Sequence, residues 1–256
     1  MDPLSFLVIL VLGALIGLAL GALGGGGSIL TIPILVYILN MNTHTAVTAS
    51  LVIVGLNALF GMVFHYRAGH VQVKQSLFFG VYGLVASYIG ARLSSILPGP
   101  ILLVLFGIVM LVIALTMLRP KRQIQKGKRQ WWWMTLLGGA GVGFLTGFLG
   151  VGGGFLIVPA LVFFLGMTMQ DAVGSSLLVI AINSTSGLLG HLNSGPLPWR
   201  EIIIFSVAGV AGLFAGTSIT KKIPAQRLSQ RFAVFVLVLA VVVLSLNIFA
   251  ALHYFT

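Results

Sequence analysis

Cysteine is absent from this chain, and acidic residues are nearly absent, with three among 256 residues. Without cysteine there is no disulfide framework and no thiolate chemistry. The motifs of hydrolases and metalloenzymes are also missing: the sequence has no HExxH, no GxSxG, no paired acids and no cluster with metal-ligand spacing. We therefore expect neither an enzyme nor a bound cofactor or metal.

Charged residues of both signs make up only 7% of the chain, whereas a soluble domain carries about 25%. Hydrophobic residues make up 59%, and apolar runs of 18 or more residues recur. Each such run is long enough to cross the roughly 30 Å hydrocarbon core of a bilayer. The composition predicts an all-α polytopic membrane protein, because the short alternating strands of a β-barrel are not visible.

The net charge of +11 comes from basic residues in the gaps between the apolar segments. This placement indicates membrane topology, so no nucleic-acid partner is expected. The largest group is the segment "RPKRQIQKGKRQ", residues 119–130, which holds six basic residues. We expect it to be a cytoplasmic linker whose charges contact anionic lipid.

The two halves of the sequence repeat each other at an offset of 126 residues, without a gap from about Gly13 to Pro98. The offset aligns Ser50 with Ser176, Asn57 with Asn183, and His65 with His191, together with many glycines. Chance does not align two asparagines, two histidines and this many glycines at one offset, so the chain is an internal duplication.

Each half has four apolar segments, and we expect a first membrane repeat at 1–118, the linker at 119–130 and a second repeat at 131–256. A cytoplasmic linker puts twelve of the fourteen basic residues inside, provided that segments 4–39 and 131–166 each enter the membrane and return. Both termini then lie outside, and the two repeats have inverted topology, which is typical of transporters.

Two glycine-rich stretches interrupt segments 4–39 and 131–166, which must each return to the membrane face from which they start. They are "GALGGGGSIL" at 21–30 and "GFLGVGGGFL" at 147–156. Four consecutive glycines disfavour a continuous helix, so we expect a hairpin or re-entrant bend with a long first arm and a short second arm. If the short arm is helical, its first N–H groups form an anion site. The residues concerned are Gly25, Gly26, Gly27 and Ser28, and Gly152, Gly153 and Gly154.

Close helix packing is the alternative explanation for glycine. It is favoured for Gly13, Gly17 and Gly21, which form a small-xxx-small face. For the glycines of the two bends, close helix packing and contact with an anion both remain as explanations.

A polar stripe follows each bend. Ser50, Asn57, Gly61 and His65 share one helical face, and the second repeat has the same stripe. Unpaired polar groups are costly in a membrane, so we expect Ser50, Asn57, Ser175, Ser176 and Asn183 to face a cavity and bind substrate. The alternative is that they bond across helices as structural residues. His65 and His191 could gate the path or relay a proton, or each could simply bond a carbonyl.

The paired motifs "LGGGGSILTIP" and "LGVGGGFLIVP" resemble those of the sulfite exporter TauE/SafE family. So do "AVTASL" and "AVGSSL" at the start of the next helix, and "HYRAGHV" and "HLNSGPLPWR" at its end. The resemblance covers essentially the whole chain. It implies an eight-segment permease of the bacterial inner membrane that moves small sulfur-containing or organic anions.

These observations predict a transporter that exports a small anion, sulfite or an organosulfonate, by alternating access. No acidic residue lies mid-segment, where proton-coupled and many cation transporters keep one. The alternatives are a passive anion channel on the same scaffold and a non-transporting membrane subunit. The sequence leaves the oligomeric state open, and a homodimer is one arrangement compatible with it.

Overall fold

The computed structural model describes residues 3–23, 25–118, 132–191, 195–220 and 225–252, and every element in these ranges is helical. The elements are α1 (Pro3–Leu23), η1 (Gly25–Leu30), α2 (Thr31–Pro33), η2 (Ile34–Ile38), α3 (Thr43–Arg67), α4 (Val73–Ser94), α5 (Gly99–Leu118), α6 (Trp132–Leu149), α7 (Gly154–Leu165), α8 (Met169–Gly190), α9 (Trp199–Thr220) and α10 (Ala225–Leu252). The predicted linker at 119–130 lies outside the described residues.

Six of the described helices are long and apolar enough to cross a membrane. They are α1, α3, α4, α5, α8 and α9, and shorter apolar helices cover parts of the two return segments and of α10. Large apolar side chains such as Val85, Phe163 and Val207 are more than half exposed on the outer surface. Lipid tails solvate such a surface and water does not, so the chain is a polytopic α-helical membrane protein.

Both predicted hairpins have a long first arm and a short second arm. In the first half, the 21-residue α1 is followed by the 3₁₀, α and π turns of residues 25–38. In the second half, the 18-residue α6 is followed by the 12-residue α7. The bends fall at the glycine runs, as predicted, because glycine disfavours continuation of the helix.

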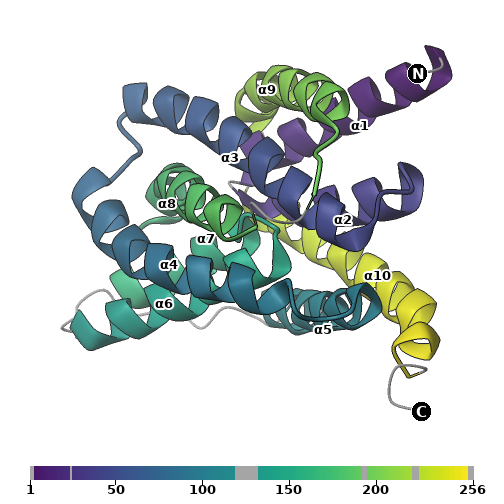
Figure 1. Cartoon of the computed structure of the whole chain (residues 1–256). Helices are drawn as coiled ribbons and strands as arrows, with labels where there is room; N and C mark the ends of the chain where they lie inside the picture. The colour runs from purple at the N-terminus through teal and green to yellow at the C-terminus, as the bar shows by residue number, and fades with distance from the viewer. Residues whose placement is uncertain (1–2, 24, 119–131, 192–194, 221–224, 253–256) are drawn as a thin grey trace.

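Helices of each half pack on helices of the other half. α1 lies along α9, and α6 lies along α4, so each half's first helix packs on a helix of the other half (Figure 1). Glycines permit this close approach. A methyl group on Gly13 would lie 2.8 Å from Phe205 O, and one on Gly139 would lie 2.6 Å from Phe79 O. The packing role predicted for the glycine stripe of α1 is confirmed.

The central pair of helices is α3 and α8, which are the most buried of the spans and contact each other (Figure 1). Each begins at a side-chain cap. Asn42 accepts a hydrogen bond from His44 N (3.0 Å), and Thr168 accepts one from Asp171 N (3.2 Å). Such caps satisfy N–H groups that the first helical turn leaves unpaired. The polar stripe is therefore held at the centre of the bundle.

Candidate functional site

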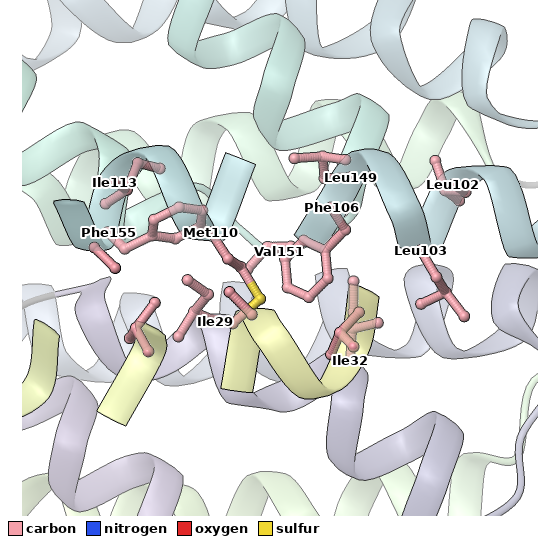
Figure 2. Close-up of a cluster of buried hydrophobic side chains, with 14 of the residues drawn as sticks. Ile29, Ile32, Leu102, Leu103, Phe106, Met110, Ile113, Leu149, Val151 and Phe155 are labelled. Atoms are coloured by element: carbon pink, nitrogen blue, oxygen red, sulfur yellow. The ribbon is translucent and has the colours of Figure 1, made fainter. Parts of the chain in front are cut away.

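The two bends meet inside the protein. Ile29 and Ile32, which follow the first bend, share one buried apolar cluster with Val151 and Phe155 of the second. Helices α5 and α10 complete this cluster, and Figure 2 shows Phe106 and Met110 of α5 beside Val151 of the second bend. Apolar side chains thus cover one side of the paired bends, and the other side faces α3 and α8.

The bends differ in conformation although their sequences match. Gly25–Leu30 form a 3₁₀ helix, so the first bend starts no α-helix directly. In the second bend, Gly150, Gly152 and Gly153 have φ between 67° and 71°, a region that other residues rarely adopt. Gly153 then caps α7 in the left-handed conformation. A helix N-terminus directly after the glycines, as predicted, forms only at the second bend.

Backbone donors gather at the second bend. The N–H groups of the segment 151–155 donate no hydrogen bond to any of the described residues. All five residues of this segment are buried. Consecutive free N–H groups at the start of a helix, together with its positive dipole end, create an anion-binding concavity.

Helix α3 packs directly on this bend. The hydroxyl of Ser50 donates to Gly150 O. Methyl groups on Gly150 and Gly152 would overlap the side chains of Val47 and Val54, respectively. The bend therefore has no room for side chains, and Ser50 holds it against α3.

Ser184 on α8 is a residue that the sequence analysis missed. Its side chain is 1% exposed, and its Oγ has no hydrogen-bond partner in the structure. Oγ lies 3.3 Å from the position that a Cβ of Gly152 would occupy. One signal was available: the offset aligns Ser184 with Ala58, so the hydroxyl breaks the repeat symmetry.

The two asparagines of the stripe are fully buried, and neither amide has a hydrogen-bond partner among the described residues. Asn183 faces Gly83 of α4, where a methyl group would lie 2.6 Å from Oδ1. Asn57 faces the matching glycine of α9, Gly209. A partnerless buried amide costs about 1–3 kcal/mol, so both side chains are held at the expense of stability.

The predicted serines have partners. Ser176 Oγ donates to Val173 O (2.7 Å), and Ser175 Oγ accepts from Gln72 N (2.9 Å). Ser28 and Gly27 are buried beside α1, where a methyl group on Gly27 would lie 2.5 Å from Leu20 N. In this conformation Ser50 and Ser176 both donate to backbone carbonyls, so substrate contact by the serines stays a prediction.

The two histidines of the stripe have different environments. His65 lies near the end of α3, and its buried Nε2 has no hydrogen-bond partner in the part of the chain that the structure describes. His191 follows α8, with Nδ1 3.0 Å from Gly187 O and Nε2 2.9 Å from Ser94 Oγ. Because a carbonyl only accepts, Nδ1 carries a proton. Burial lowers the pKa of His191 more than the carbonyl contact raises it, and His44 lowers it further.

Hydrogen bonds join α4 to α8 along their whole length. At one end Gln72 Nε2 donates to Asp171 Oδ2 (3.0 Å), and in the middle Ser87 Oγ donates to Asn183 O (2.8 Å). Ser186 Oγ also donates to Leu84 O (2.6 Å), and the Ser94–His191 contact closes the other end.

The matching pair, α3 and α9, has no such bonds: among the described residues, no resolved hydrogen bond joins these two helices. The sequence explains the difference. The position that matches Gln72 holds Pro198, which has no N–H group, and the position that matches Ser175 holds Ala49. Ser87 is replaced by Leu213. The two halves therefore share a fold but not their polar contacts.

A cavity of about 570 Å³ opens where the bonds are missing. It lies between the first turns of α3 and α9, beside the start of α1. Its lining includes Ser5, Ile9, Asn42, Thr45, Pro198 and Glu201. At the matching place in the other half, the Gln72–Asp171 hydrogen bond occupies the interface. The lining contains one carboxylate and no basic residue, so the cavity wall itself is not an anion site.

A bundle of membrane-spanning helices with two broken hairpins and partnerless polar groups at its centre is the architecture of a polytopic membrane transport protein. The chain belongs to the sulfite exporter TauE/SafE family, whose profile matches residues 9–243.

Relatives across this family are named as transporters. A probable membrane transporter protein of Xylella fastidiosa (strain Temecula1) is 34% identical, with 94% of this chain and 95% of the relative aligned. The probable membrane transporter protein YdhB of Bacillus subtilis is 28% identical, over 85% and 91% of the two chains. No solved structure gives a significant match.

Proposed function

We propose that the protein is a secondary transporter that carries a small oxyanion, sulfite or an organosulfonate, out of the cytoplasm by alternating access. The observation that carries this proposal is the pair of buried, partnerless amides of Asn57 and Asn183 on the two central helices. Two matching amides left unpaired at a cost to stability are typical of groups kept for a ligand.

The proposed substrate contacts are the amides of Asn57 and Asn183 and the N–H groups of the two bends, Gly25–Ser28 and Gly152–Gly154. An oxyanion needs hydrogen-bond donors, and amide N–H groups supply them without a permanent positive charge that would hold the anion too tightly. The contacts of Ser50, Ser175 and Ser176 would have to rearrange before these side chains joined the site.

The proposed mechanism moves one inverted repeat against the other. Its support is the contrast between the open cavity beside Thr45 and Pro198 and the hydrogen-bonded cluster of Gln72 and Asp171 at the equivalent place. In an inverted arrangement these places lie at opposite membrane faces. The conformation would then be open on the side of the cavity and closed on the side of Gln72.

The proposed topology places the linker 119–130 in the cytoplasm, against anionic lipid of a bacterial inner membrane, with both termini outside. The absence of cysteine makes this simple to test. In intact spheroplasts, a membrane-impermeant maleimide should label Ser95→Cys, in the exposed turn after α4. Gln125→Cys, in the linker, should react only after permeabilisation. The reverse labelling pattern would contradict the orientation.

Transport itself should appear as saturable sulfite flux in liposomes that contain the purified protein, with sulfate, acetate and a short sulfonate as competitors. A potential of 100 mV contributes about 2.3 kcal/mol per charge. A monovalent anion carried without a coupling ion should therefore reach a roughly 50-fold gradient per 100 mV. An inside-negative potential would drive export.

The controls separate the alternatives. Flux that stays linear at high sulfite concentration, without counterflow, indicates an anion channel. Absence of flux for every tested anion, in protein that is monodisperse and melts cooperatively, contradicts the proposed substrates and favours a non-transporting subunit.

A further inference from the structure

The second bend contains a set of backbone hydrogen-bond donors that have no acceptor in the described part of the protein. The backbone N–H groups of the segment 151–155 are buried, and no resolved hydrogen bond among the described residues is donated by them. Three glycines with positive φ turn the chain so that these groups lie at the N-terminus of the 12-residue α7. This geometry alone favours a negative charge.

Ser184 adds an independent observation at the same place. Ser184 is 1% exposed, its hydroxyl has no hydrogen-bond partner among the described residues, and its Oγ lies 3.3 Å from the Cβ position of Gly152. Most helix serines in this structure bond a carbonyl, as Ser186 does with Leu84 O at 2.6 Å. Ser184 instead keeps its donor beside the free N–H groups, so the side chain and the backbone can bind the same ligand.

The first bend differs from the second in its backbone conformation and in the residue that matches Ser184. Its glycines lie in a 3₁₀ helix, none of the described ones has a positive φ, and the residue matching Ser184 is Ala58. The sequence repeat therefore does not produce two equivalent sites.

We propose that the backbone N–H groups of the segment 151–155 and the Ser184 hydroxyl together form a single binding site for a small oxyanion. This inference rests on the proposed transport function and narrows it to one bend. The oxygens of a sulfite- or sulfonate-like group can accept hydrogen bonds from the backbone N–H groups and from the Ser184 hydroxyl. A substrate without such oxygens leaves the donors unpaired and is rejected.

Val54 of α3 covers the site in this conformation, because a methyl group on Gly152 would overlap its side chain. Helix α3 also carries Thr45, which lines the open cavity. Displacement of α3 is therefore the movement that uncovers the donors, and it links the site to the cavity side of the protein.

The test compares Ser184→Ala with Ser186→Ala, two variants that each remove one buried hydroxyl from α8. Sulfite binding is measured on the detergent-purified full-length protein by titration calorimetry, and sulfite KM is measured in liposomes. Loss of one hydrogen bond to a charged ligand should weaken sulfite binding about 10- to 100-fold in Ser184→Ala. Ser186→Ala should bind sulfite within about twofold of wild type, because its hydroxyl already pairs with Leu84 O.

The outcomes are distinguishable. If wild type binds sulfite and Ser184→Ala binds it equally well, with an unchanged melting temperature, the site is wrong while the transport proposal stands. Equal weakening in both serine variants also overturns the site, because it indicates a general effect on α8. If wild type neither binds nor moves sulfite, both proposals fail for this anion.

Discussion

Gly147→Ala should prevent α6 from packing against α4 and destabilise the protein by about 3 kcal/mol or more, at the upper end of the cost of overpacking. The added methyl group would overlap the backbone oxygen of Ser87. A backbone oxygen cannot move aside as a flexible side chain can, so the two helices would have to separate along their whole contact. The loss should appear as a lower melting temperature and as aggregation during size-exclusion chromatography.

The matched control is Gly141→Ala on the same helix. Gly141 is exposed, and a methyl group there would have no neighbour within 4 Å. Its effect should stay within about 1 kcal/mol, the range of helix propensity. Gly17→Ala, in the α1–α9 contact of the other half, should be as damaging as Gly147→Ala because its methyl group would overlap Gly209 O. Equal melting temperatures for Gly147→Ala and Gly141→Ala would contradict the packing described for α6.

The double variant Asn57→Ala, Asn183→Ala should lose saturable anion flux by at least about 100-fold while the melting temperature stays the same or rises. Each wild-type amide is buried without a partner, which costs about 1–3 kcal/mol. Alanine removes that cost. If the asparagines were structural residues bonded across helices, the same substitutions would instead lower stability. The sign of the change in melting temperature therefore separates the two interpretations.

Asn247→Ala on α10 is the control for this experiment. Asn247 is 7% exposed, but its amide donates to Val243 O at 2.7 Å and to the hydroxyl of Tyr37. Its loss should lower the melting temperature and leave the sulfite KM unchanged. Unaltered flux in the double variant would remove the basis for substrate contact by Asn57 and Asn183.

Much of the fold follows from local sequence. The apolar runs predict the spans, and the glycine runs predict two bends with a long arm before each and a short arm after it. The glycine spacing at Gly13, Gly17 and Gly21 predicts a close helix contact, which α9 provides. These predictions succeed because they depend on properties within one segment: hydropathy, length and the low helix propensity of glycine.

The positions of the two stripe asparagines could be predicted from the sequence, but their lack of hydrogen-bond partners could not. The spacing of the stripe places Asn57 and Asn183 on one face of α3 and α8, and the cost of polar groups in a membrane indicates an enclosed environment. The missing partners could not be foreseen, because they depend on which groups the neighbouring helices present. Here each asparagine meets a glycine, Gly209 or Gly83, which has no side chain to offer.

By itself, the sequence determined the class of protein, its duplication, the places where each hairpin bends and the positions of its polar residues. The tertiary structure alone decided that α1 packs on α9 and α6 on α4, that only the second glycine run begins an α-helix, and that Ser184 lies against Gly152. The physical reason is that glycine permits several backbone conformations at similar cost, so the contacts around each run select one. Surroundings that differ between the halves, such as Gln72 against Pro198, turn a repeated sequence into two unequal interfaces.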